Sequence, residues 1–300
     1  MVMLLSARVT LAIAVGACSI AANAAPTKQT PALTLFAATK AKALQGDADA
    51  QYKLGQMYAQ GRGVAQDYGV AVSWFRRAAE QGYAVAQNSL GFMYYSGQGV
   101  AQDYYAAVSW FRRAAEQGYA DAQNNLAVMY DQGRGVAQDY GVAVSWFRKA
   151  AEQGYAVAQN NLGVTYDKGQ GVAQDYAAAV SWYRKAAEQG FSASQSRLAY
   201  MYYDGQGVAQ DYAAAVSWYR KAAEQGDTRA QVNLGNMYFN GAGVAQDYVQ
   251  AHKWFNLAGA GAKDAETRDN ATKNRDIVAA KMQPAQIAEA QRLANEWRKK

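Results

Sequence analysis

Residue types that commonly catalyse reactions or bind metals are almost absent from this chain of 300 residues. It contains one histidine, His252, and one cysteine, Cys18. Zinc and copper sites draw on clusters of Cys and His, and an activated nucleophile usually needs a histidine base or a lysine in an apolar pocket. We therefore expect no metal site, no cofactor and no catalytic residue. His252 is interpreted as a residue on the surface of a helix.

Glycine pairs separated by one residue, such as Gly61 and Gly63, could belong to phosphate-binding loops. In a dinucleotide site such glycines follow a strand and continue to a third glycine at a fixed spacing. Here each pair follows a helical pattern and lacks that third glycine, so the pairs are predicted to end helices. The net charge of +6 could favour nucleic acid, but acids and bases alternate throughout the chain. We expect no nucleic-acid partner.

Tryptophan recurs every 36 residues, which shows that most of the chain is one module copied six times without insertion. The recurring residues are Trp74, Trp110, Trp146, Trp182, Trp218 and Trp254. Because the copies can be aligned with one another, positions that packing fixes can be distinguished from positions that vary. The invariance of the tryptophans predicts that they are buried between copies.

Each copy carries the pattern of two short helices. In the first copy, Ala50 and Leu54 lie on one side of a helix that we expect to end near Gln60. Asp67 stands where its carboxylate can cap a second helix, which is predicted to run to about Gln81. Two helices of this length cannot bury both apolar faces alone, so the copies must stack. The sequence therefore predicts an all-α fold, an α-solenoid of helix-turn-helix repeats.

The conserved positions of the module resemble those of the Sel-one-like repeat (SLR) family, which is related to the tetratricopeptide repeat. The matching segments are A-Q-x-x-L-G-x-M-Y from Ala86 to Tyr94, G-x-G-V-x-x-D-Y from Gly97 to Tyr104, and A-x-x-W-F-R-x-A-A-x-x-G from Ala107 to Gly118. The resemblance covers six copies over residues 47–262. It implies a right-handed superhelix that serves as a non-enzymatic scaffold or adaptor for protein complexes, often in the bacterial envelope.

The N-terminal segment, residues 1–24, has the features of a signal peptide. An apolar run from Val9 to Ile20 precedes Ala22-Asn23-Ala24, the small-x-small pattern of a cleavage site. We expect the mature chain to start at Ala25, to lie in the periplasm and to contain no transmembrane span. The alternative is a membrane-anchored lipoprotein in which Cys18 is acylated.

Capping segments are predicted on both sides of the repeats. Residues 25–46 form a linker and an N-terminal capping helix, which is expected between Ala32 and Gln45. Residues 263–300 break the period of the repeats but keep amphipathic spacing on both sides of Pro284. They are interpreted as a C-terminal pair of capping helices, since terminal repeats need one polar outer face.

One set of positions on the first helix of each copy varies freely and lies on a single face, opposite the conserved stripe. We interpret this face, which by the resemblance is the concave one, as the surface that binds a partner protein. Aromatic anchors towards both ends and carboxylates at the centre favour a peptide segment or helix with a basic centre and hydrophobic flanks. The candidate residues are Tyr52, Phe92, Tyr95, Asn124, Val128, Asp131, Asn160, Asp167, Tyr200, Tyr203, Asn236 and Phe239.

The second helix offers an alternative surface, a stripe of basic residues that is expected to point to solvent. Such a stripe could attach the protein to anionic envelope glycan or lipid. Its ten cations are Arg76, Arg77, Arg112, Arg113, Arg148, Lys149, Arg184, Lys185, Arg220 and Lys221. A third hypothesis, binding or hydrolysis of β-lactams, comes from cysteine-rich relatives in the family, but the disulfide-bridged repeats of those relatives are absent from this sequence.

Overall fold

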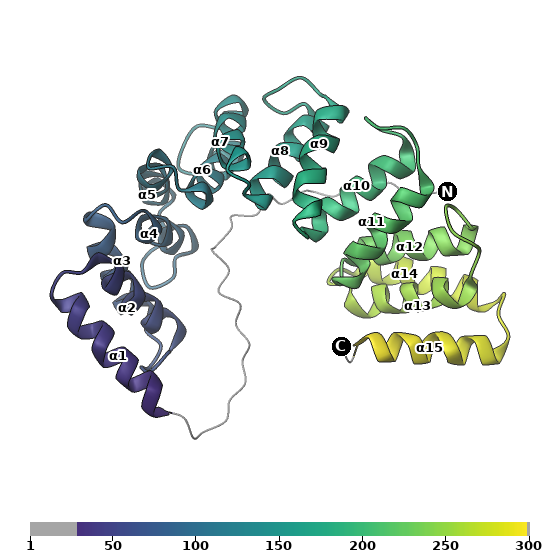
Figure 1. Ribbon diagram of the computed structural model, residues 1–300, viewed down its shortest axis with the longest axis horizontal. Helices are drawn as coiled ribbons and strands as arrows, with labels where there is room; N and C mark the ends of the chain where they lie inside the picture. Colours follow the sequence, from purple (N-terminus) through teal and green to yellow (C-terminus); the bar gives the residue numbers. More distant parts are fainter. Residues whose placement is uncertain (1–28, 299–300) are drawn as a thin grey trace. The chain divides into compact units, whose positions relative to one another are not determined.

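A computed structural model describes the backbone of residues 29–298, and it is entirely helical over that range (Figure 1). Each of the six repeats contributes a first helix and a second helix. The first helices are α2 (Ala48–Gln60), α4 (Ala84–Ser96), α6 (Ala120–Gln132), α8 (Ala156–Lys168), α10 (Ser192–Asp204) and α12 (Thr228–Asn240). The second helices are α3 (Tyr68–Glu80), α5 (Tyr104–Glu116), α7 (Tyr140–Glu152), α9 (Tyr176–Glu188), α11 (Tyr212–Glu224) and α13 (Tyr248–Gly261). The predicted α-solenoid is confirmed.

Three further helices cap the repeats. The N-terminal cap α1 (Gln29–Leu44) packs against α2, and the C-terminal caps α14 (Ala265–Ala279) and α15 (Pro284–Arg298) both pack against α13. The predicted signal peptide, residues 1–24, lies outside the described residues. None of the helices in the described part combines the length and the apolar character that crossing a bilayer requires.

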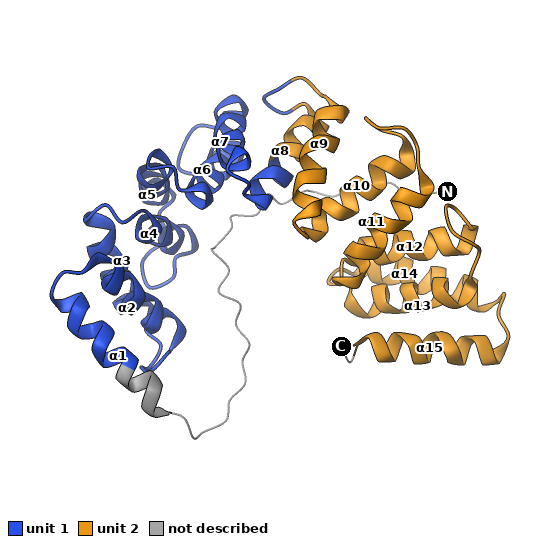
Figure 2. Ribbon diagram, in the orientation of Figure 1, with its two compact units in different colours: residues 1–161, 170–172 blue, residues 162–169, 173–300 orange. Residues whose placement is uncertain are grey.

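The chain divides into two compact units, with the division inside α8 (Figure 2). The first unit extends to Asn161 and includes residues 170–172, and the second comprises residues 162–169 and 173–300. In both units the small and apolar residues that recur in each copy form the core, as Leu90 and Phe111 do in the first and Leu234 and Phe255 in the second.

A buried glutamine in the first helix joins a repeat to the one before it and links the two helices of its own repeat. Gln87 of α4 donates from Nε2 to the Ala79 carbonyl oxygen of α3 at 3.1 Å. Its Oε1 accepts from Nε2 of Gln117, the residue that follows α5, at 2.7 Å. We call this arrangement the glutamine bridge. Other bridges are centred on Gln51, Gln123 and Gln195.

The two glycines between the helices of a repeat have different roles. Gly205 follows α10 in the left-handed conformation, with φ of 74°, and its amide donates to the Met201 carbonyl, as predicted for a helix end. Gly207 also has a positive φ, 67°, but it lies against the preceding repeat. A Cβ atom at this position would come within 2.3 Å of the Tyr176 carbonyl oxygen. The second glycine is therefore a packing residue as well as a turn residue.

We predict that Gly207→Ala destabilises the second unit more than Gly226→Ala does. Both glycines have positive φ, but a Cβ at Gly226 would meet nothing within 4 Å. Gly226→Ala should carry only the cost of the left-handed conformation, about 1–2 kcal/mol, whereas Gly207→Ala adds a steric cost of about 1–3 kcal/mol. Unfolding midpoints in urea measure the difference. Equal losses in the two variants would contradict the packing role.

Candidate functional site

The predicted partner-binding residues fall into two groups when their burial is compared. Eight are half-buried and reach the surface: Tyr52, Phe92, Tyr95, Asp167, Tyr200, Tyr203, Asn236 and Phe239. The other four are buried: Asn124 and Val128 are 0% exposed, and Asp131 and Asn160 are each 8% exposed. The interpretation that packing leaves this whole face free is wrong for these four residues.

The buried asparagines form a continuous chain of side-chain amides across three first helices of the first unit. Asn160 donates to Asn161 at 3.3 Å, and Asn161 donates to Asn124 at 2.9 Å. Asn124 in turn contacts Asn125 at 3.5 Å, and Asn125 donates to Asn88 of α4 at 3.0 Å. We call this series the asparagine ladder. It satisfies amides that would otherwise be costly to bury, so Asn124 and Asn160 are structural residues.

The two central acids, Asp131 and Asp167, are placed differently from the expectation of a free acidic surface. The buried hydroxyl of Tyr183 donates to Asp167 Oδ2 at 3.3 Å. Burial, with Asp167 as the second cause, raises the pKa of Tyr183 well above its usual range. The Asp131 carbonyl oxygen accepts from Gln138 Nε2 at 2.7 Å, while its carboxylate is buried. Asp131 is therefore withdrawn from the surface, and Asp167 is held by a buried tyrosine of its own repeat.

Aromatic rings from the two helices of a repeat meet beside the interhelical loop in three repeats. The ring centroids are 5.5 Å apart for Tyr95 and Tyr104, 5.2 Å for Tyr203 and Tyr212, and 5.7 Å for Phe239 and Tyr248. We call these the aromatic pairs. The first lies in the first unit and the other two lie in the second.

The aromatic pairs are an addition to the repeat and are not needed to build it. Three repeats have Ala59, Asp131 or Asp167 at the position that Tyr95, Tyr203 and Phe239 occupy in the aromatic pairs. In these repeats the tyrosine at the start of the second helix has a different partner. A loop glutamine donates to its hydroxyl at 2.9–3.0 Å, as in Gln138 to Tyr140. The helices end at equivalent residues in both kinds of repeat. A first-helix aromatic residue at this position is therefore optional for the fold.

The basic stripe on the second helices is tied into the structure. Of each pair of cations, the second lies over the tryptophan of its own helix. Lys149 Nζ, for example, is 4.1 Å from the centroid of Trp146. The first cation donates to a tyrosine of the next repeat, as Arg112 does to Tyr130 at 2.8 Å. Eight of the ten cations are exposed, as expected, and the other two, Arg76 and Arg184, are half-buried. Contacts of the same two kinds recur at Arg76, Arg77, Arg113, Arg184, Lys185, Arg220 and Lys221.

Most of the recurring tryptophans are half-buried beneath these cations. Trp146 and its equivalents in the first five repeats keep part of the ring accessible, so the prediction that all six are buried is wrong. Trp254 alone among them is buried, at 3% exposed, because α14 and α15 pack against α13. The tryptophans thus belong to an edge of the repeat that only the C-terminal cap covers.

His252 is buried at 2% exposed, so its interpretation as a surface residue is wrong. It lies on α13 near Arg275 and Asp276 of α14, and no described residue forms a hydrogen bond with its Nδ1. Burial lowers the pKa of His252, Arg275 lowers it further and Asp276 opposes the shift. Valine occupies the equivalent position in the other five repeats. His252 is therefore a neutral core residue under the C-terminal cap.

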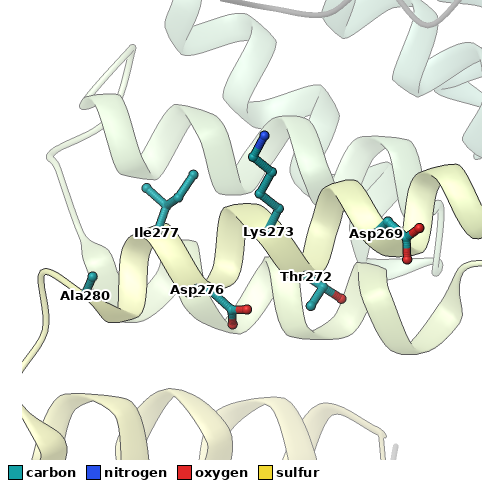
Figure 3. Close-up of a pocket in the computed structure, with 6 residues that line it drawn as sticks. All are labelled: Asp269, Thr272, Lys273, Asp276, Ile277 and Ala280. Carbon is teal, nitrogen blue, oxygen red and sulfur yellow. The ribbon is translucent and has the colours of Figure 1, made fainter.

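A shallow hollow runs along α14, but its composition does not favour catalysis. Figure 3 shows the six residues that line it, all from this one helix: Asp269, Thr272, Lys273, Asp276, Ile277 and Ala280. Ligand sites usually collect polar groups from several elements. No group of three or more histidine, cysteine or acidic side chains within the described residues is placed to hold a metal ion.

We predict that the C-terminal cap loses stability as the pH falls below about 6.5. The pKa of His252 is lower in the folded protein than in the unfolded chain, so folding favours the neutral imidazole. The stability that this preference provides is fully present above the unfolded pKa and decreases as the pH falls below it. Thermal unfolding of the wild type should therefore begin at a lower temperature at pH 5.5 than at pH 7.5. His252→Val, which restores the residue of the other repeats, should reduce this difference. An unchanged pH dependence in His252→Val would contradict the assignment.

Comparison with known proteins identifies the repeat. The family model of the Sel1 repeat matches residues 48–83, 84–119, 120–155, 156–191, 192–227 and 228–262. A crystal structure of a protective antigen present in uropathogenic Escherichia coli strains, with an SLR fold, is 42% identical with a TM-score of 0.76. The alignment covers 87% of this chain but 56% of the antigen.

A second solved structure agrees over a shorter part of the chain. The Sel1 repeat protein from Oxalobacter formigenes is 31% identical, with a TM-score of 0.66, and the alignment covers 77% of this chain and 97% of that protein. A search of curated proteins found no significant match.

Proposed function

The chain belongs to the Sel1 repeat family, and on that premise we propose that it is an exported scaffold that binds a segment of another protein along its first helices. Proteins of this family generally act as protein-interaction scaffolds and typically are not enzymes. The small number of residues suited to catalysis in this sequence agrees with that role.

The aromatic pairs are the observation that carries this proposal. Tyr95, Tyr203 and Phe239 keep part of their rings at the surface, although the repeats with Ala59 or Asp167 at this position fold without an aromatic residue. Tyrosine and other aromatic residues at a surface are typical anchors for a partner because they bury a large area with few rotatable bonds. Arg134 of this chain lies over Tyr95 and Tyr104, and Lys281 lies over Phe239. The partly exposed remainder of the rings offers a place for the apolar part of a partner side chain.

The basic second-helix stripe is the weaker candidate for binding. Attachment to anionic glycan or lipid would need cations that are free to approach the ligand. Arg112 already donates to Tyr130, and Lys149 lies over Trp146. These contacts give the stripe a structural role between and within repeats. The experiment below distinguishes binding through the stripe from binding through the aromatic pairs.

We predict that the double variant Tyr203→Ala and Phe239→Ala increases the dissociation rate of a protein partner at least about tenfold, because truncated anchors act mainly on dissociation. The measurement uses a partner recovered from envelope extract, purified, and assayed by surface biosensor. Tyr105→Ala is the matched control, since Tyr105 is 78% exposed on α5 and belongs to no aromatic pair.

The proposal fails if the double variant and the control bind alike. If neutralising Arg112, Arg113, Arg148 and Lys149 abolishes binding while the double variant retains it, the basic stripe takes the place of the aromatic pairs.

Export is proposed from the sequence of the N-terminal segment, which lies outside the described residues. We predict that the exported protein starts at Ala25, because Ala22-Asn23-Ala24 follows an apolar stretch of signal-peptide length. Intact-mass spectrometry of protein from a periplasmic fraction measures the start directly. A mass that corresponds to an acylated N-terminal Cys18 would instead establish the lipoprotein alternative.

A further inference from the structure

Tyrosine hydroxyls and carboxylates gather where the first helices of the first unit begin. Tyr155, which directly precedes α8, donates from its hydroxyl to Asp121 Oδ1 of α6 at 3.0 Å. Tyr119 directly precedes α6, and the charge of Asp121 contributes to raising its pKa. We call Tyr119, Asp121 and Tyr155 the tyrosine–aspartate cluster. All three residues belong to the first unit and are half-buried.

The carboxylate of this cluster has no cation beside it. Asp49, which accepts from Tyr83 at 3.2 Å in a similar arrangement, is also paired with Lys53 Nζ at 2.6 Å. No described residue forms an ion pair with Asp121. A half-buried carboxylate that accepts from a tyrosine hydroxyl lies in a partly desolvated setting, where a cation is attracted more strongly than in bulk water.

The tyrosines of the cluster are neutral over the whole physiological range. Burial, with Asp121 as the second cause, raises the pKa of Tyr119 to about 12. The same two causes raise the pKa of Tyr155 further. The hydroxyls therefore stay protonated, that of Tyr155 stays bonded to the carboxylate, and the ring faces add the negative quadrupole that attracts cations.

Helix formation does not explain these residues. An acid in the first turn complements the helix dipole, yet Val85 and Val157 occupy the position of Asp121 in α4 and α8, which are helices of the same length. Tyr119 is the N-cap of α6 and makes no side-chain capping bond, whereas Asp227 caps α12 with a bond to the Ala230 amide at 2.8 Å. The Tyr119 ring instead packs against the hydrophobic core of α5 and α6, so Asp121 is the residue of the cluster that helix formation does not require.

The asparagine ladder holds the cluster in place. Asn124 lies one turn after Asp121 on α6, and it accepts from Asn161 of α8 at 2.9 Å. This buried bond fixes the start of α6 beside the start of α8, which brings Tyr155 to Asp121. A binding group that is supported by buried hydrogen bonds loses little freedom when its ligand arrives.

We propose that the tyrosine–aspartate cluster binds a cationic side chain, Lys or Arg, of the partner segment. The inference rests on the proposed scaffold function and adds a charged contact to the apolar ones. Asp121 supplies the counter-charge, and Tyr119 and Tyr155 supply aromatic surface for the aliphatic stem and the cation. The sequence predicted a basic centre in the partner from Asp121, Asp131 and Asp167, and the proposal assigns the contact to Asp121.

The test uses a fluorescein-labelled decapeptide that carries Lys at every third position, and the same peptide with every Lys acetylated. Anisotropy titrations at low salt should show that the charged peptide binds the full chain more tightly than the acetylated one. Asp121→Asn, which keeps the shape and removes the charge, should weaken binding of the charged peptide about tenfold. Asp269→Asn removes an exposed charge from α14 and is the matched control, expected to change binding less than twofold.

Three outcomes overturn the inference: equal binding of the charged and acetylated peptides, equal effects of Asp121→Asn and Asp269→Asn, or no measurable binding of either peptide. Tyr155→Phe, which removes only the hydroxyl, should weaken binding less than Asp121→Asn does, and circular dichroism checks that each variant is folded. The double variant Tyr203→Ala and Phe239→Ala should bind the charged peptide normally. If the peptide test fails while binding of the protein partner still depends on the aromatic pairs, the cation-binding role of the cluster is refuted and the proposed scaffold function is not.

Discussion

The glutamine bridge is the interaction on which the stacking of this protein depends. A buried amide needs partners for both its donor and its acceptor, because an unpaired polar group inside a protein is costly. Gln123 finds the acceptor in Ala115 of the preceding repeat and the donor in Gln153, which follows the second helix of its own repeat, so one repeat is satisfied only when another repeat or a cap precedes it. At the N-terminal end, the cap α1 supplies the missing carbonyl through Ala43. At the other end, glycine replaces glutamine at position 261, and Gln231 Oε1 has no partner among the described residues.

This constraint separates the residues that build the repeat from those that are free to differ. Leucine, alanine and the bridging glutamine recur because each packs against the same neighbours in every copy. The aromatic pairs and the tyrosine–aspartate cluster lie at the two ends of the first helices, beside the loops and at the helix starts. Between them, the asparagine ladder fills the middle of the same face in the first unit. Candidate binding residues are therefore held by a rigid centre.

Periodicity and capping were sufficient to predict the fold because they are local. The second helix was expected from Asp67 to about Gln81, and α3 runs from Tyr68 to Glu80 with Asp67 as its N-cap. Burial by neighbouring copies was harder to predict. Variation among copies was interpreted as exposure, but Asn124 and Asn160 are each followed by a second asparagine that hydrogen-bonds them, and Asn161 also donates to Asn124 of the preceding repeat. Two adjacent asparagines at the same position of two consecutive copies were the feature of the sequence that could have predicted a buried ladder. His252 aligns with Val216, a buried residue, and its burial could have been read from that alignment.

Interchangeable junctions have a genetic consequence. The bridge uses the same residue types at Gln87 and Gln117 as at Gln195 and Gln225, and Gly99 and Gly243 approach the preceding backbone in the same way. A duplication of 36 residues among the copies outside the asparagine ladder would therefore keep the glutamine and glycine contacts at the new junction. The second to fourth copies are different, because Asn125 needs Asn88 and Asn161 needs Asn124 as buried partners across their junctions. A change in the number of copies is thus compatible with the fold only where it leaves the order of these three copies intact.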